Sequence, residues 1–124
     1  LTTVEFWEKR QCLARENIEN CGLSEYVTFK IGQAVDVIRD ELQNELFDLV
    51  FMDVNKAEYL SLYQEFDKLV KRGGIVLADN VISHAKKAAP FLEAIKENSY
   101  YQSEVLDLPD GLLMAYKLVY EDFG

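Results

Sequence analysis

Residues 47–56 read FDLVFMDVNK and residues 73–80 read GGIVLADN, and these two short stretches decide the fold. Each contains an almost continuously apolar run, which is typical of a strand buried on both faces of a parallel sheet. The first run ends at Asp53 and the second at Asp79. Neighbouring parallel strands bring their carboxyl ends to the same sheet edge, so we expect the two carboxylates to lie close together.

Two further polar residues accompany these carboxylates. Asn80 directly follows Asp79, and Lys56 lies one short loop beyond Asp53. Carboxylate and amide oxygens are the ligands that Mg²⁺ prefers. Three such oxygens beside an amine suggest a small hard-cation site with a base next to it. Taken singly, Asp53 has the simpler interpretation of a solvated strand-end carboxylate, and Lys56 that of a surface lysine.

Length and composition describe one globular domain at most. The chain has 124 residues, of which 49% are hydrophobic, and no apolar run approaches the roughly 20 residues of a membrane span. No secretory leader is visible, and two cysteines are too few for a disulfide framework, so we expect a cytoplasmic protein with reduced thiols. The net charge of −9 disfavours bulk electrostatic binding to nucleic acid or anionic membranes.

The rest of the chain alternates between strand and helix patterns, which predicts an α/β fold with a mostly parallel sheet. A final pair of runs around a Pro-Asp-Gly turn predicts an antiparallel terminal hairpin. The expected strands are residues 1–4, 26–31, 47–52, 75–78, 101–108 and 112–119. The expected helices are residues 8–21, 34–42, 57–71 and 90–98.

The helix predicted over residues 57–71 has a clear apolar stripe, which we expect to face the core. Its spacing is helical, and Gly73 and Gly74 mark its expected end. The stripe consists of Tyr59, Leu62, Tyr63, Phe66 and Leu69. A substrate-stacking role for its aromatic members is secondary.

Other polar residues also follow predicted strands. Glu5 ends the first strand, and Gln33 lies just after the second. Ligands in open α/β sheets bind beyond the carboxyl ends of the strands. Together with Asp53, Asp79 and Asn80, these residues form a pattern in which polar side chains follow the ends of several predicted strands. Glu5 also has a simpler explanation as an acid favoured near a helix N-terminus.

The stretch FDLVFMDVNKAEY, together with LYQEFDKLVKRGGIVLADNV, resembles the cation-dependent O-methyltransferases of the catechol and caffeoyl-CoA type. The upstream TTVEFWEKRQCLARENIENCGLSEYVTFKIGQA and the late DGLLMAYK fit the same family. The resemblance implies a three-layer, Rossmann-like methyltransferase sheet. It also implies methyl transfer from S-adenosylmethionine to a hydroxyl of a small vicinal-diol or catechol-like aromatic acceptor.

The resemblance also implies roles for individual residues. Asp53, Asp79 and Asn80 match the family's ligands for Mg²⁺, or Mn²⁺ or Ca²⁺, and Lys56 matches its catalytic base. The donor-binding positions matched are Glu5 at the ribose hydroxyls, Gln33 and Ala34 beside the adenine, and Asp53. A lysine with a depressed pKa is expected to take the proton from a cation-bound hydroxyl.

The family's first strand and glycine-rich loop have no counterpart here, so we interpret residues 1–124 as the carboxyl-terminal two-thirds of such a domain. A missing central strand leaves two strand edges unpaired. We expect the chain either to pair residues 1–4 with Phe47–Met52 or to associate as a dimer or other homo-oligomer. Donor binding by this chain alone should be weak or absent.

Two other functions stay open. The chain could be a non-catalytic fragment or binding module of the same fold. Alternatively, it could methylate a modified-base hydroxyl in RNA, against which the net charge of −9 argues. The residues that follow Asn80, Val81 to Ala85, depart from the bulky residue and glycine common in the family, so the acceptor is not identified.

Overall fold

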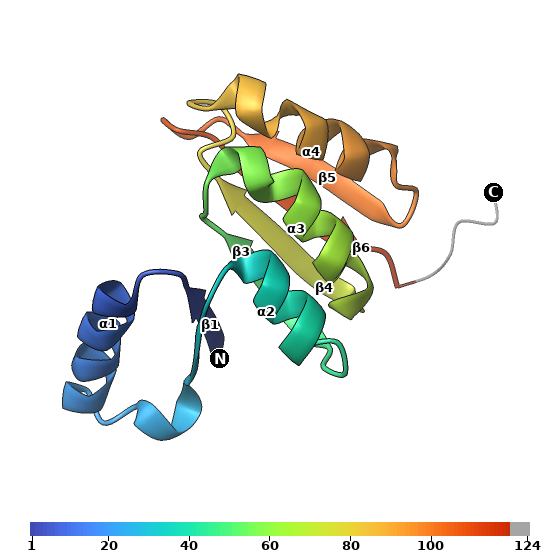
Figure 1. The fold of residues 1–124 in the computed structure, drawn as a ribbon. Coiled ribbons are helices and arrows are strands. Elements are labelled where there is room, and N and C mark those ends of the chain that lie inside the picture. Colours follow the sequence, from blue (N-terminus) through green and yellow to red (C-terminus); the bar gives the residue numbers. More distant parts are fainter. Residues whose placement is uncertain (120–124) are drawn as a thin grey trace. The chain divides into compact units, whose positions relative to one another are not determined.

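A computed structural model of the chain describes residues 1–119, which divide into two compact units, residues 1–43 and residues 44–119. Each unit combines strands with helices (Figure 1). The α/β class predicted from the sequence is therefore confirmed. No helix among the described residues is long and apolar enough to cross a membrane.

The first unit contains a two-stranded parallel sheet and two α-helices. Strand β1 (Thr2–Glu5) leads into helix α1 (Glu8–Asn20), and strand β2 (Thr28–Ile31) leads into helix α2 (Ala34–Glu41). The two strands pair from Thr2 opposite Thr28 to Glu5 opposite Ile31. Both strands therefore end at the same edge of this small sheet.

The second unit contains a four-stranded sheet in the order β3-β4-β6-β5. Strand β3 is parallel to β4, whereas β6 is antiparallel to both of its neighbours, as the predicted terminal hairpin requires. Helices α3 and α4 connect the strands. The bounds are β3 Phe47–Met52, α3 Tyr59–Phe66, β4 Val70–Asp79, α4 Ala85–Glu97, β5 Tyr101–Leu106 and β6 Leu112–Lys117.

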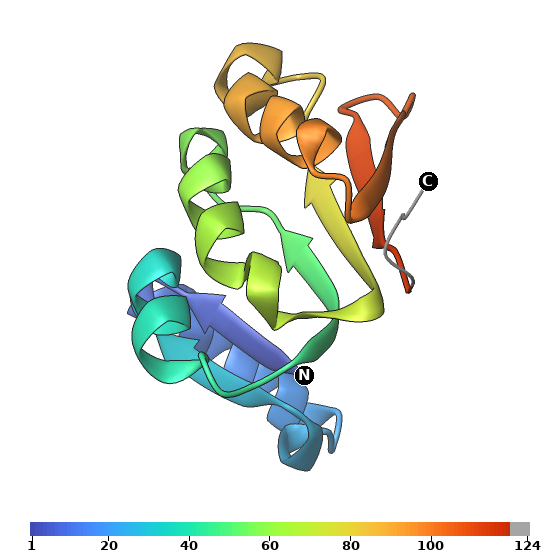
Figure 2. The same cartoon turned by 90° about the vertical axis from the view of Figure 1, so that its right-hand side faces the viewer.

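Helices α3 and α4 cover one face of this sheet (Figure 2). Beneath them lies the core of the second unit, in which the rings of Tyr59 and Tyr63 meet the ring of Phe91 edge to face. The helices bury the strand residues that point toward them. These are Met52, Val76, Ala78, Leu113 and Ala115.

The opposite face of the same sheet is apolar and open. Leu49 and Phe51 of β3 are 54% and 57% exposed, so the prediction that this strand is buried on both faces is wrong. Across the sheet, Leu49 aligns with Tyr116 through β4, and Phe51 aligns with Met114. The apolar run in β3 thus has one face on the helices and one face toward solvent.

The helix predicted over residues 57–71 is shorter than expected, and its predicted end is wrong. Two short 3-10 turns, Lys56–Glu58 and Asp67–Leu69, flank α3, and the chain is already extended at Val70. Gly73 adopts a φ of +86°, and the pairing register shifts between Phe47 and Leu49. The double glycine therefore forms a bulge inside β4, where Gly74 leaves no room for a Cβ beside the Lys71 carbonyl.

The expected pairing of residues 1–4 with β3 is also wrong. Within residues 1–119, β1 pairs with β2 alone and β3 pairs with β4 alone, in two separate sheets. The alternating sequence pattern indicates which residues form strands, but strand partners depend on segments far apart in the chain. Association with another copy stays a prediction.

Candidate functional site

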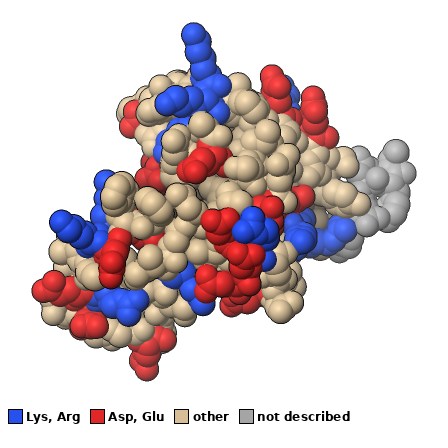
Figure 3. Space-filling model, viewed as in Figure 1, with Lys and Arg blue, Asp and Glu red and all other residues tan. Residues whose placement is uncertain are grey.

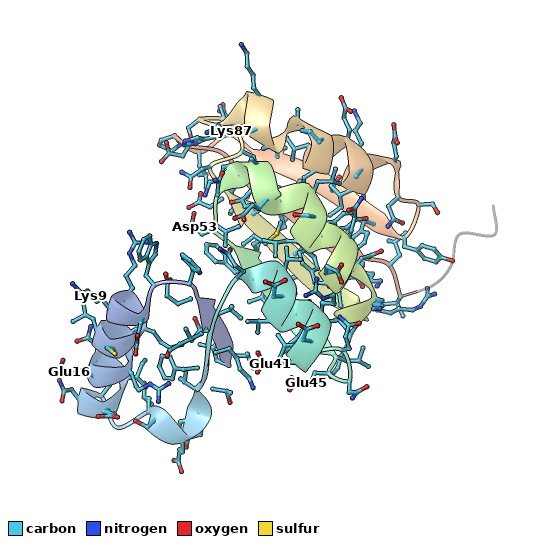
Figure 4. All side chains as sticks on the ribbon, viewed as in Figure 1. Lys9, Glu16, Glu41, Glu45, Asp53 and Lys87 are labelled. Carbon is cyan, nitrogen blue, oxygen red and sulfur yellow. The ribbon has the colours of Figure 1, made fainter. Side chains whose placement is uncertain are left out.

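The candidate site lies where β3 and β4 end in the second unit. The last paired residues of the two strands are Met52 and Ala78. The next residues are Asp53 and Asp79, so parallel pairing places both acids at the same edge of the sheet, as predicted. Figure 4 labels Asp53 beyond the end of β3.

Lys56 is held against Asp53 by a short ion pair. Its Nζ donates to Asp53 Oδ1 and to the Val54 carbonyl, each at 2.8 Å. The Lys56 side chain is 10% exposed, whereas that of Asp53 is 52% exposed. The interpretation of Lys56 as a plain surface lysine is therefore wrong, because its stem is buried and its ammonium has fixed partners.

The protonation of Lys56 follows from these contacts. Burial by itself lowers the pKa of the Lys56 ammonium, but the hydrogen bond that it donates to Asp53 and the neighbouring Tyr59 phenol together outweigh burial. The net result is a pKa above the ordinary value of 10.5. The expected depressed pKa is not found in this structure, since the paired carboxylate stabilises the charged lysine.

Asp79 and Asn80 form a tight turn at the end of β4. The Asp79 Oδ1 accepts the backbone N–H of Asn80 at 2.8 Å. Asn80 has a φ of +61°, in the left-handed region that asparagine tolerates better than most residues. Its carbonyl then accepts the N–H of His84 at 3.1 Å. The turn therefore constrains both side chains at the sheet edge.

A second loop supports this turn. The Asp110 carbonyl accepts the N–H groups of Ile82 and Ser83 at 3.0 and 3.1 Å. Gly111 has a φ of +78°, and a Cβ there would lie 2.3 Å from the Ile82 side chain. Only glycine allows the hairpin loop to approach the turn this closely.

The donor set suits a hard divalent cation. Asp53, Asp79 and Asn80 offer two carboxylates and one amide, all oxygen donors of the type that Mg²⁺ and Mn²⁺ bind. Among residues 1–119, no group of three or more His, Cys, Asp and Glu side chains is arranged to hold a metal. A site here would therefore depend on the amide oxygen and on substrate or water oxygens to complete the coordination.

The other predicted site residues lie in the first unit. Glu5 ends β1, and its Oε1 accepts the N–H of Trp7 at 3.1 Å, just before α1. Gln33 is the residue preceding α2, and Ala34 is the first residue of that helix. These residues follow the paired ends of β1 and β2. Their proposed contacts with S-adenosylmethionine stay a prediction.

One residue at the site, Tyr59, is predicted by the sequence to face the core, with substrate stacking as a secondary role. Tyr59 is fully buried, and its hydroxyl lies 3.1 Å from the Met52 carbonyl and 2.8 Å from the Asp79 carbonyl. The sequence signal that could have linked Tyr59 to the site was its position three residues after Lys56. The spacing puts both on one side of a helical turn, but it does not show what the hydroxyl bonds.

The chain matches known proteins along most of its length. Residues 1–110 match the family model described as O-methyltransferase. A catechol O-methyltransferase of Niastella koreensis is 32% identical over 88 residues, covering 69% of this chain and 40% of that protein. A caffeoyl-CoA O-methyltransferase of Pinus taeda is 32% identical over 100 residues, covering 77% and 39%.

Solved structures agree with this assignment. The O-methyltransferase of Bacillus cereus, solved in complex with SAH, superimposes with a TM-score of 0.87 at 25% identity, covering 94% of this chain and 61% of that one. In the two sequence alignments above, the chain spans about two fifths of the length of each curated relative. Its fold is the Rossmann-like fold of these methyltransferases, and the chain belongs to the O-methyltransferase family.

Proposed function

We propose that this chain is part of an enzyme that transfers a methyl group from S-adenosylmethionine to a hydroxyl of a small catechol-like acceptor, with the help of a divalent cation. The observation that carries the proposal is the pairing of Lys56 with Asp53 at the strand edge shared with Asp79. Family membership and relatives named for catechol and caffeoyl-CoA support the acceptor class.

Each residue has a defined part in this proposal. Asp53, Asp79 and Asn80 would hold the cation, and Glu5, Gln33 and Ala34 would contact the donor. When bound, the cation lowers the pKa of a coordinated hydroxyl and the sulfonium supplies an electrophilic methyl group. Lys56 would take the proton of the acceptor's hydroxyl group onto its Nζ.

Lys56 becomes a competent base only when the charge of Asp53 is offset. In the structure, the Asp53 carboxylate and the Tyr59 phenol together keep the pKa of Lys56 above its ordinary value. If that charge is neutralised, burial of the Lys56 side chain, which is the largest single influence and favours the neutral amine, is opposed by the Tyr59 phenol alone. The proposal therefore assigns two tasks to Asp53, ligation and control of the lysine.

Calorimetric titration tests the proposal directly. The chain is titrated with Mg²⁺, with S-adenosylmethionine, and with the donor in the presence of Mg²⁺. Binding of both ligands supports the assignment. Binding of neither would restrict the activity to a longer protein containing this sequence. Methyl transfer to a catechol by such a protein, retained after Lys56→Met, would remove Lys56 from the mechanism.

We propose that a second copy of the chain covers the open apolar face of the second unit. The side chains available are Leu49 and Phe51 of β3 and Met114 and Tyr116 of β6. They are between 38% and 57% exposed and share one face by strand register. Sedimentation of the chain as a dimer that Phe51→Asp dissociates supports this. A monomer at all concentrations contradicts it.

The surface agrees with a small-molecule acceptor better than with RNA. Figure 3 shows acidic side chains interspersed with basic ones, without a broad basic area on the face in view. The net charge is −9. Nucleic-acid binding surfaces concentrate Lys and Arg because they neutralise phosphates. A filter-binding measurement with RNA at low salt should therefore detect no complex.

A further inference from the structure

We infer that Tyr59 is a positioning residue for the candidate cation site, which it serves by holding together the two strand ends that carry Asp53 and Asp79. The inference rests on the proposed function for the identity of the ligand. The contacts of Tyr59 themselves do not depend on that function. They connect β3, β4 and Lys56 through one buried side chain.

The hydroxyl of Tyr59 bridges the ends of the two strands. It lies 3.1 Å from the carbonyl of Met52, which directly precedes Asp53, and 2.8 Å from the carbonyl of Asp79. The strand pairing itself stops one step earlier, at Met52 and Ala78. A phenol has a single hydrogen to donate, so the two carbonyls share it. Tyr59 thus continues the connection between the strands beyond their last pair.

The bridge is fixed from the helix side. Tyr59 has no exposed surface, and its ring packs edge to face on Phe91 with centroids 5.7 Å apart. Burial and these contacts allow the ring little freedom, so the hydroxyl position is set by the core. Burial also raises the pKa of Tyr59 above 10.0, which keeps the hydroxyl protonated as a donor.

The same ring also contacts the lysine of the site. Lys56 Nζ lies 5.2 Å from the centre of the Tyr59 ring while it donates to Asp53. A cation at this distance is attracted by the ring face. Tyr59 therefore contacts the carbonyl that precedes Asp53, the carbonyl of Asp79 and the ammonium of Lys56, although it is not itself a ligand.

A matched pair of variants tests this inference. Tyr59→Phe removes only the hydroxyl from the bridge. Tyr63→Phe removes a hydroxyl from the next turn of the same helix. Tyr63 is 6% exposed, and its hydroxyl accepts a hydrogen bond from Asn98 Nδ2 at 2.7 Å. Urea unfolding of both variants establishes that they fold and ranks their stabilities.

The first measurement is the affinity of each variant for Mn²⁺ alone, by calorimetry of the full chain. We expect Tyr59→Phe to bind at least about tenfold more weakly than the unmodified chain, since removing groups that orient metal ligands costs 10- to 100-fold. Tyr63→Phe should stay within about twofold. Equal affinities for the two variants would overturn the inference.

The second measurement separates this inference from the proposed function. Amide hydrogen exchange is followed at Asp53 and Asn80 without any metal. Loss of the bridge should speed exchange there by about tenfold in Tyr59→Phe and not in Tyr63→Phe. If the unmodified chain binds no Mn²⁺, the proposed cation site fails, and the exchange result alone decides whether Tyr59 holds the strand ends.

Discussion

The two units of the chain differ in how completely they bury their apolar side chains. In the second unit, α3 and α4 enclose a core that includes Tyr59, Phe91 and Ile95, each with no exposed surface. In the first unit, Phe6 and Trp7 are 51% and 58% exposed, and helix α1 buries only Gln11. The second unit therefore has its own core, whereas the first presents apolar surface that further polypeptide could cover.

This difference coincides with a division of the proposed chemistry. The residues proposed as cation ligands and base lie in the second unit, where the buried Tyr59 hydroxyl bonds the carbonyls of Met52 and Asp79. The residues proposed to contact the donor, Glu5, Gln33 and Ala34, lie in the first unit. Precise placement of ligands needs rigid support. We therefore expect the residues of the proposed cation site to be better ordered than the residues proposed to contact the donor.

The largest expected effect is on the free energy of unfolding, and it compares the loss of a buried ring with the loss of an exposed one. Phe91→Ala should lower the free energy of unfolding by about 3–5 kcal/mol, because it leaves a cavity beneath α3 and α4. Trp7→Ala should change it by no more than about 0.5 kcal/mol. Urea denaturation followed by circular dichroism gives both values. Comparable losses would show that the first unit has a core of similar quality.

Cation binding should belong to the second unit alone. Asp79→Asn keeps an oxygen for the Asn80 N–H but removes a charge, so the affinity for Mg²⁺ should fall by at least about tenfold, or about 1.4 kcal/mol. The matched control is Asp36→Asn in the first unit, where the side chain is 57% exposed and paired with Arg39. An equal loss in the control would place the cation elsewhere.

Alkaline pH should destabilise the second unit through Tyr101. Burial and the hydrogen bond to Asp67 raise the pKa of Tyr101 above its ordinary value of 10.0. Below pH 10 both folded and unfolded chains carry the proton, and the stabilisation is complete. As the pH rises above 10, the unfolded chain loses its proton first, so the free energy of unfolding falls.

The variant Tyr101→Phe isolates this effect. It should be less stable than the unmodified chain at neutral pH, and the gap should narrow between pH 10 and 12. Tyr26→Phe, at a position that is 64% exposed in the first unit, is the control and should leave the pH profile unchanged. A gap that stays constant with pH would mean that Tyr101 ionises equally in both states.

The smallest expected effect lies on the surface of the first unit. Arg39 pairs with Asp36 at 2.9 Å and with Asp40 at 3.0 Å, and these partners raise the pKa of its guanidinium. All three side chains are more than half exposed, so solvent screens the pairs. Arg39→Ala should leave the unfolding midpoint within experimental error, and a clear shift would give this unit an unexpected electrostatic contribution.

Local patterns predicted much of the secondary structure and of the candidate site. The bounds of Phe47–Met52 were predicted correctly, as were the positions of Asp53 and Asp79 at a common sheet edge. Glycines were less informative. Gly73 and Gly74 suggested a helix end but form a bulge, because a positive φ serves either structure.

Some features of the candidate site follow from adjacent residues, and others depend on contacts between residues far apart in the chain. The apolar runs, their β-propensity and the acids that terminate them are properties of adjacent residues, so the strands and the ligand chemistry follow from the chain alone. Three other features cannot be read from adjacent residues. They are the open face of β3, the raised pKa of Lys56 and the Tyr59 bridge. They arise from burial and hydrogen bonds set by the folded chain, and Tyr59 and Asp79, which the bridge joins, are 20 positions apart. These contacts form only when the chain folds, so their contribution to pKa values and to positioning depends on the tertiary structure.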